Sequence, residues 1–228
     1  AAAGAKVAVL DTSLEPARAL ARETGGIAVR CDVTSAPGTE EAIREARRTH
    51  GPARVLVNCA GIATGGRIVG RDGPLALEEF ARTIDVNLNG TFNALRLAAA
   101  DMATLEPLDG GERGVIVMTA SVAAHEGQIG QAAYAASKGG VASLTLPAAR
   151  ELARFGVRVV TISPGVFKTP MFDSLPQGVR EGLASSVPFP PGPADPAAYA
   201  QLVLHMVENR VLNGCVVRLD GAIRMPLR

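Results

Sequence analysis

The order of strands and helices is set out in the stretch KVAVLDTSLEPARALARETGGIAVRC, which runs from Lys6 to Cys31. Its first part, residues 6–10, is a short apolar run rich in valine, which is typical of a buried strand. An amphipathic pattern follows over residues 14–24 and stops at Gly25-Gly26, so it predicts a helix. Residues 27–31 form a second short apolar run. The stretch therefore predicts two parallel strands joined by a helical crossover.

The same alternation continues to the end of the chain. Further strands are expected at residues 54–57, 114–118, 157–162 and 215–219, and further helices at 39–50, 75–104 (interrupted at 87–90), 131–154 and 197–209. The strands are apolar on both faces, which is typical of a parallel sheet covered by helices on both sides. The right-handed crossover rule then favours an α/β fold with a doubly wound parallel sheet. At 228 residues, the chain is predicted to be one domain, residues 1–228.

Composition argues against several classes of protein. The formal net charge of +1 gives no electrostatic attraction to nucleic acid or to an anionic membrane surface. No apolar stretch approaches the ~18 residues that a membrane-spanning helix needs. The three cysteines lie far apart and without metal-ligand spacing, which is typical of a reducing compartment. We therefore expect a cytoplasmic protein with no metal site and with no nucleic-acid or membrane partner.

Tyr134 and Lys138 are scarce residue types placed four positions apart. The chain has two tyrosines and three lysines, and residues four apart share one face of a helix. A phenol has a pKa near ~10, and a cation nearby favours the phenolate and lowers that pKa. The pair is therefore a candidate acid/base site. A phenol at a helix surface with a solvated lysine beside it is the structural alternative.

Polar residues follow the predicted strands, at the edge of the sheet where ligands bind in doubly wound folds. Asp11 follows the first strand, in the place where an acidic residue of a dinucleotide fold accepts hydrogen bonds from the adenosine ribose. A carboxylate there also repels a 2′-phosphate, which favours NAD over NADP. Aspartate is equally favoured at the start of a helix, so that alternative remains open.

Five motifs in order resemble the short-chain dehydrogenase/reductase family, which has a Rossmann-like fold, over nearly the whole chain. They are the Asn58-Cys59-Ala60-Gly61 turn, Asn87 in a helix break, Ser121 thirteen residues before Tyr134, the pair Tyr134 and Lys138, and Ser163-Pro164-Gly165 followed by Thr169. The resemblance implies that Tyr134 exchanges the proton of the reacting hydroxyl, while Lys138 lowers its pKa and holds the nicotinamide ribose. It further implies that Ser121 holds the reacting oxygen and that Asn87 fixes a water. An asparagine satisfying loosened helix backbone is the alternative for Asn87.

Longer stretches are similar to the type 2 3-hydroxyacyl-CoA dehydrogenases within that family. They are residues 119–124, 126–128, 130–134 and 219–225. The resemblance implies oxidation of a 3-hydroxyacyl-CoA by NAD in fatty acid metabolism, and a homotetramer. It places Asp32, Val33 and Cys59 at the adenosine half of the cofactor, and Phe167 and Thr169 at the nicotinamide half. A 3-oxoacyl-carrier-protein reductase, a steroid or alcohol dehydrogenase, and a noncatalytic scaffold subunit are the alternatives.

The glycine-rich turn that opens a dinucleotide fold is absent from the sequence. Residues 1–5 resemble instead the end of the helix that should follow this turn. We therefore expect the domain to lack its first strand–helix unit, which corresponds to about 25–30 residues upstream of Ala1.

The segment 170–193 is rich in proline, serine and glycine and shows little regular pattern, which is typical of a lid over a substrate. Candidate substrate contacts are Met171, Phe172, Leu175 and Leu183, together with His125, which lies between Ser121 and Tyr134. A surface loop that packs on its own apolar residues is the alternative.

Overall fold

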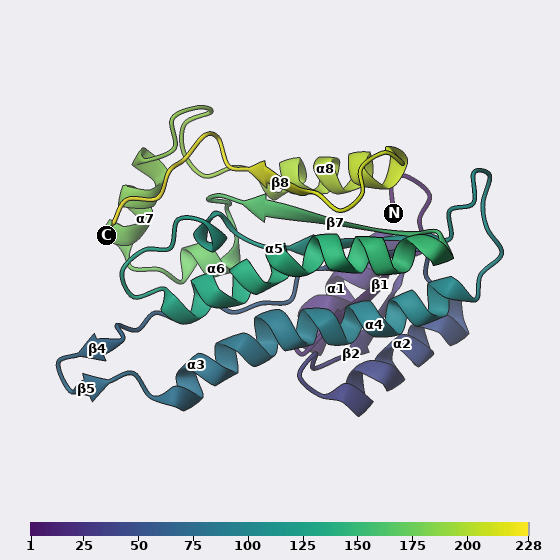
Figure 1. The fold of residues 1–228 in the computed structure, drawn as a ribbon, viewed down its shortest axis with the longest axis horizontal. Coiled ribbons are helices and arrows are strands. Elements are labelled where there is room, and N and C mark those ends of the chain that lie inside the picture. The colour runs from purple at the N-terminus through teal and green to yellow at the C-terminus, as the bar shows by residue number, and fades with distance from the viewer. Residues whose placement is uncertain (228) are drawn as a thin grey trace.

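Parallel strands form two separate sheets in the computed structural model, which describes residues 1–227 (Figure 1). The smaller sheet pairs β1 (Ala8–Asp11) with β2 (Ile27–Arg30). The larger has the order β3 (Val55–Asn58), β6 (Gly114–Thr119), β7 (Val157–Pro164) and β8 (Val216–Leu219). All six strands were predicted from the sequence. A two-stranded antiparallel hairpin, β4 (Val69–Gly70) with β5 (Gly73–Pro74), was not predicted.

Helices connect these strands. They are α1 (Leu14–Thr24), α2 (Ala36–His50), α3 (Leu77–Ile84), α4 (Gly90–Ala103), α5 (Ala132–Leu152), α6 (Pro170–Asp173), α7 (Gln177–Ser185) and α8 (Pro196–Glu208). Short 3₁₀ turns lie at η2 (Val122–Ala124) and η3 (Ala153–Phe155). Local signals explain several boundaries. Gly25 ends α1 in the left-handed region with φ 66°, and the Ser35 side chain accepts a hydrogen bond from Gly38 N at the start of α2. No helix within residues 1–227 is long and apolar enough to cross a membrane.

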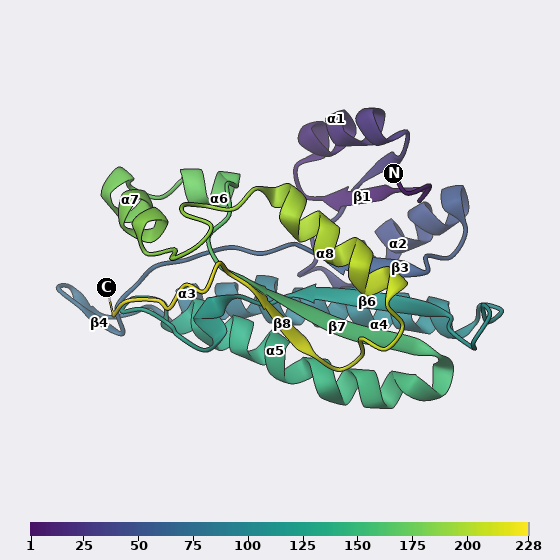
Figure 2. The ribbon, with the colours of Figure 1, turned by 90° about the horizontal axis from the view of Figure 1, so that it is seen from above.

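Helices cover both faces of the four-stranded sheet, as Figure 2 shows. On one face α4 and α5 pack against β6 and β7 around fully buried Met102, Ile116 and Val159. On the other face α8 packs around Met206, Val160 and Ile162. Burial on both faces is what the continuous apolar runs predicted, so the Rossmann-like α/β fold is confirmed.

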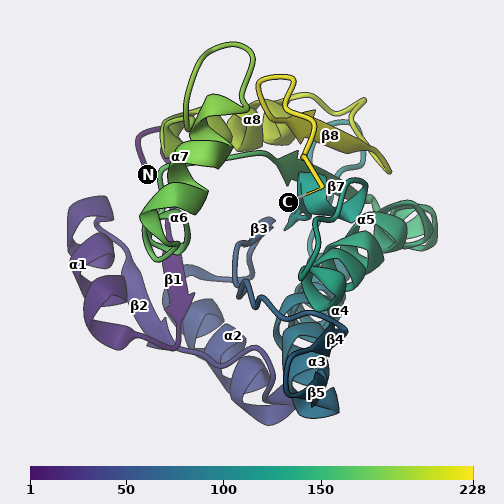
Figure 3. The same ribbon diagram turned by 90° about the vertical axis from the view of Figure 1, so that its left-hand side faces the viewer.

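No hydrogen-bonded strand pair joins the two parallel sheets within residues 1–227. Figure 3 shows β1 and β2 with α1 and α2 on one side and the four-stranded sheet on the other. Among the described residues, no strand joins β1 to β3. The outward edge of β3 is consequently open, and its Val55 and Val57 side chains are exposed.

The predicted helix over residues 75–104 is interrupted where its propensity fails. A π-helical turn, η1 (Asp85–Asn89), joins α3 to α4. Such turns widen a helix locally and often occur at functional sites.

The segment 170–193 is more regular than the sequence suggested. It contains α6 and α7, although little regular pattern was expected there. Both helices are short, and a helix of four or nine residues gives a weak periodic signal.

Candidate active site

Tyr134 and Lys138 lie on α5 beside the carboxyl ends of β3 and β6. The Lys138 side chain is buried, and its Nζ donates a hydrogen bond to the Thr119 carbonyl oxygen at 2.8 Å. The same Nζ lies 5.9 Å from the centre of the Tyr134 ring, so phenol and ammonium occupy one side of the helix as predicted. A buried ammonium with a fixed acceptor cannot swing away into solvent, and it therefore has a defined place beside the phenol.

Ser121 begins the 3₁₀ turn that follows β6. Its backbone is extended, and its Oγ accepts a hydrogen bond from Ala123 N at 3.2 Å. The side chain is buried and lies next to the Tyr134 phenol, with which it hydrogen-bonds. The structure thus brings together Ser121, Tyr134 and Lys138, and Asn87, from an earlier part of the chain, also reaches this site.

Burial shifts the pKa of both titratable groups against their charged forms. Desolvation raises the pKa of Tyr134 above 10, and the hydrogen bond with Ser121 acts in the opposite direction. Desolvation lowers the pKa of Lys138 to about 8. The pKa of Tyr134 is therefore raised, whereas a lowering by Lys138 was expected, and the cost of burying the phenolate is the largest cause.

Asn87 is the central residue of the π-helical turn and is fully buried. Its Oδ1 accepts a hydrogen bond from Ile62 N at 2.8 Å, and its Nδ2 donates to Ile62 O at 2.9 Å and to Ser137 Oγ at 3.0 Å. The side chain therefore fastens the loop after β3 to α5. It does not satisfy its own loosened helix, whose Asn87 carbonyl accepts from Thr91 Oγ1 at 2.7 Å.

The turn after β3 passes close to the lysine. A Cβ added to Gly61 would lie 3.2 Å from Asn87 Oδ1 and 3.5 Å from Lys138 Nζ, so glycine keeps this approach open. The preceding Cys59 and Ala60 are exposed, while Asn58 is buried and its Nδ2 has no hydrogen-bond partner among the described residues. An open turn with an unsatisfied amide at a strand end fits the edge of a dinucleotide.

Two carboxylates at the ends of β1 and β2 face solvent. Asp11 Oδ1 accepts a hydrogen bond from Ser13 N at 2.7 Å, so one of its oxygens does serve the turn into α1. Asp32 Oδ1 accepts from Thr34 Oγ1 at 2.7 Å and from Thr34 N at 2.9 Å, and these bonds lower its pKa. Val33 is half-buried, and its carbonyl accepts from Asn93 Nδ2 at 3.1 Å. Both carboxylates are thus held in place by hydrogen bonds with an oxygen facing solvent, which suits ribose hydroxyls.

The turn after β7 closes the other end of the site. Gly165 N donates to Leu219 O at 3.0 Å, directly after Pro164. Phe167 is buried, and its ring meets the Tyr199 ring edge-on, with centroids 6.5 Å apart. Thr169 accepts a hydrogen bond from Phe172 N and begins α6. Residues assigned to the nicotinamide half are therefore held by β8, α8 and α6.

These observations fit the two nucleoside ends of a dinucleotide. In this fold a strand pairs with both β1 and β3 in the sheet, and the glycine turn after that strand binds the pyrophosphate. Within residues 1–227 no strand takes this place in the sheet. No group of three or more His, Cys, Asp or Glu side chains in the described part of the chain is placed to hold a metal ion.

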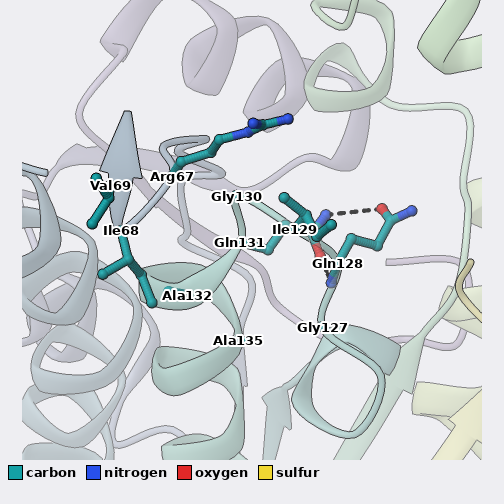
Figure 4. A pocket seen from close by; sticks show the side chains of 10 residues that line it. All are labelled: Arg67, Ile68, Val69, Gly127, Gln128, Ile129, Gly130, Gln131, Ala132 and Ala135. Atoms are coloured by element: carbon teal, nitrogen blue, oxygen red, sulfur yellow. Dashed lines mark hydrogen bonds between the residues drawn. The ribbon is translucent and has the colours of Figure 1, made fainter. Parts of the chain in front are cut away.

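A pocket of about 400 Å³ lies between the hairpin and the start of α5 (Figure 4). Ile68 and Val69, at the start of the hairpin, form part of its wall, and the loop before α5 contributes Gln128 and Gln131. Gln131 directly precedes α5. Its Nε2 donates to Gln128 Oε1 at 3.2 Å.

Neither the three residues Ser121, Tyr134 and Lys138 nor the residues predicted to touch substrate line this pocket, so the substrate contacts stay a prediction. The predicted contacts are His125, Met171, Phe172, Leu175 and Leu183, of which His125 and Met171 are exposed and the others are half-buried. The hairpin and the two glutamines were not predicted. Their positions depend on an isolated β-bridge between Gly66 and Gln131, and no local sequence pattern predicts this long-range contact.

A second missed group lies beneath Lys138. Thr119 Oγ1 donates to Asn58 O at 2.6 Å, and the Tyr199 hydroxyl lies 2.6 Å from the same Oγ1. Because the single proton of Thr119 points to a carbonyl, Tyr199 is the donor in the second bond. These two hydrogen bonds, the second from Tyr199 on α8, fix the position of Thr119, whose carbonyl accepts from Lys138.

Known proteins share these features. Residues 1–180 match the short chain dehydrogenase family. The chain is 51% identical over 226 residues to the 3-hydroxyacyl-CoA dehydrogenase type-2 of Homo sapiens, covering 97% of this chain and 87% of that protein. It is 56% identical over 196 residues to the protein of the same name from Bos taurus, covering 85% and 75%.

A solved structure agrees with the sequence relatives. The crystal structure of 3-hydroxyacyl-CoA dehydrogenase type-2 from Mycobacterium avium superimposes with a TM-score of 0.93 at 43% identity, covering 100% of this chain and 89% of that one. Sequence, fold and the grouping of Ser121, Tyr134 and Lys138 thus agree. The chain belongs to the short-chain dehydrogenase family of oxidoreductases.

Proposed function

We propose that the protein transfers hydride between NAD and a 3-hydroxyacyl-CoA, interconverting it with the 3-oxoacyl-CoA. One observation carries the proposal: a phenol, a buried ammonium and a serine hydroxyl meet on one face of α5 beside the turn after β3. The relatives named 3-hydroxyacyl-CoA dehydrogenase type-2 support the choice of substrate class.

The proposed roles follow from the chemistry of a secondary alcohol. Oxidation breaks the C–H bond, whose electron pair leaves as hydride, and the hydroxyl proton passes to the Tyr134 oxygen, which has to be in its phenolate form in this direction. Bound NAD supplies the hydride acceptor, and its reduced form is the donor in the reverse direction. In the reduction, the Tyr134 phenol returns the proton to the carbonyl oxygen. Its raised pKa keeps it protonated and suits it to that donation. Ser121 orients the reacting oxygen by a hydrogen bond.

The preference for NAD over NADP rests on Asp11. Its carboxylate is exposed at the end of β1, where the adenosine ribose of this fold binds. A 2′-phosphate there would meet a like charge. Asp32 and Val33 would complete the adenosine end, and Cys59 would lie between this end and Lys138.

We further propose a homotetramer that acts in cytoplasmic fatty acid metabolism. The helices α4 and α5 expose apolar side chains, among them Phe92 and Leu146, which supports association of copies through these helices. Light scattering combined with gel filtration measures the assembly, and a monomer at micromolar concentration would contradict it.

The test is NADH consumption with acetoacetyl-CoA, measured for the wild type and for Tyr134→Phe. Loss of the phenolic proton should lower kcat by about 10²–10⁴-fold. NADH affinity, measured by fluorescence titration, should stay unchanged. Equal rates in both proteins would remove Tyr134 from the reaction. Turnover of a carrier-protein thioester or a steroid, with none of any short acyl-CoA, would overturn the substrate class.

A further inference from the structure

Glu126 and Arg218, which play no part in the reaction above, form an ion pair. Glu126 belongs to the loop that joins Ser121 to Tyr134, and Arg218 is on β8, near the start of the C-terminal tail (residues 219–227). Arg218 donates to Glu126 Oε1 at 2.8 Å and to Oε2 at 3.4 Å. Arg224 Nε lies 3.4 Å from Oε1, and Met225 N donates to Oε2 at 3.1 Å. One carboxylate of the serine loop is therefore held by two arginines and by the backbone of the tail.

The tail is itself a fixed turn. Arg218 Nε donates to Asp220 Oδ2 at 2.7 Å, and a second nitrogen of Arg218 donates to Ile223 O at 3.1 Å. Asp220 Oδ1 accepts from Ala222 N at 3.0 Å, which accompanies a left-handed Ala222 with φ 62°. The two arginines balance the charges of the two carboxylates. A residue in this strained conformation persists where its surroundings hold it.

An apolar contact reinforces the same junction. Ile223 of the tail is fully buried against Val122, which directly follows Ser121, and against Val187 in the segment 170–193. Phe189 N donates to Gly221 O at 3.3 Å. A Cβ added to Gly221 would lie 2.7 Å from a Val187 methyl group, so the segment approaches the tail closely. The tail thus touches both the serine loop and the end of the proposed lid.

We propose that Glu126 is a positioning residue, through which the C-terminal tail holds the Ser121 loop in register with Tyr134. The Glu126 side chain is 23% exposed and the Arg218 side chain 26%. The four polar contacts of Glu126 fix the position of this loop against the tail. The hydrogen bond from Arg218 lowers the pKa of Glu126, so its charge is present throughout the neutral range.

The experiment compares Glu126→Gln with a matched control, Asp101→Asn. Asp101 is also 23% exposed and pairs with Arg47 at 2.8 Å, but it lies on α4, away from the tail. Both changes remove one carboxylate charge and keep its shape. We expect Glu126→Gln to lower kcat with acetoacetyl-CoA about tenfold, equivalent to one 1.4 kcal/mol step in the barrier. NADH affinity and Tm should change no more than in the control. Equal kcat in the two variants would overturn the proposal.

A second measurement needs no substrate. Hydrogen–deuterium exchange should accelerate in Glu126→Gln at the amides of Ala123 and Glu126, which donate to Ser121 Oγ and Val122 O, and over residues 219–227. Asp101→Asn should leave these amides unchanged. The kinetic arm rests on the proposed reaction, whereas this arm does not. If the wild type fails to reduce acetoacetyl-CoA, the proposed substrate fails while exchange alone decides the role of Glu126. Unchanged exchange in both segments would overturn that role.

Discussion

Replacing Lys138 by methionine should remove one specific component of the pH dependence of folding stability. The ammonium is 4% exposed, and desolvation lowers its pKa from 10.5 to about 8. The folded-state pKa is thus below the unfolded-state value. Between these two values the unfolded chain binds the proton and the folded chain does not, so stability rises with pH across this interval.

The size of the effect follows from the shift. At about 1.36 kcal/mol per pKa unit, a fall from 10.5 to about 8 corresponds to about 3 kcal/mol. Below pH 8 the folded protein carries the whole cost of burying the charge. Above pH 10.5 both states are neutral and the cost is gone. Wild type should therefore gain about 3 kcal/mol from this residue between these limits, and Lys138→Met should gain nothing from it.

The assay is urea unfolding of both proteins at several pH values from 7 to 10.5, with the free energy of unfolding compared at each pH. Groups that titrate in this interval without coupling to Lys138 cancel in the difference, and Cys59, whose pKa is raised by burial and lowered by the Lys138 charge, is replaced by alanine in both proteins. That difference should shift by about 3 kcal/mol in favour of the wild type as the pH rises. A difference that stays constant with pH would show that Lys138 titrates normally, and that its burial carries no such cost. Activity of the variant should be lost at every pH.

Three further changes test other parts of the structure. Asp11→Ser should raise NADPH affinity relative to NADH by tenfold or more, about 1.4 kcal/mol, because a like charge is removed; an unchanged ratio by fluorescence titration would contradict the role of Asp11. Arg158→Met should cost about 3–5 kcal/mol in urea unfolding, since the buried guanidinium donates to Glu112 and to the Met206 and Val207 carbonyls near the end of α8; a midpoint equal to that of the wild type would refute this. Gly165→Ala should weaken NADH binding and lower stability by about 1–3 kcal/mol, because the new Cβ would lie 2.8 Å from the Asp220 backbone; unaltered binding and Tm would argue against a tight turn.

Local patterns predicted most of the elements that form the sheet and its covering helices. The helix α1 has the boundaries expected, since Gly25 both stops the periodic pattern and adopts the left-handed conformation that ends a helix. The break near Asn87 was also predicted, although its π-helical form depends on packing. Short elements such as β4 and α6 were missed, because two to four residues carry too little periodicity.

The residues of the site could be predicted from the sequence, but the directions of their pKa shifts could not. Spacing on one helix brings Tyr134 and Lys138 together, and burial then determines the direction of both pKa shifts. Burial depends on residues far along the chain, so the raised phenol pKa did not follow from the motif. The contact between Glu126 and Arg218 is a similar case, since 92 positions separate two ordinary surface residue types.

The small sheet with α1 and α2 carries the adenosine end of the site, and within residues 1–227 it shares no strand pairing with the four-stranded sheet. The small sheet with α1 and α2 contacts the rest of the molecule partly through the loop before α2, where Val33 O accepts a hydrogen bond from Asn93 Nδ2. Such a unit opens at a lower free energy than the four-stranded core. A dinucleotide that touches Asp11 on one side and Lys138 on the other bridges the two parts. Its binding free energy therefore stabilises the state in which both parts are in place, and local opening of residues 6–50 becomes rarer as the cofactor concentration rises.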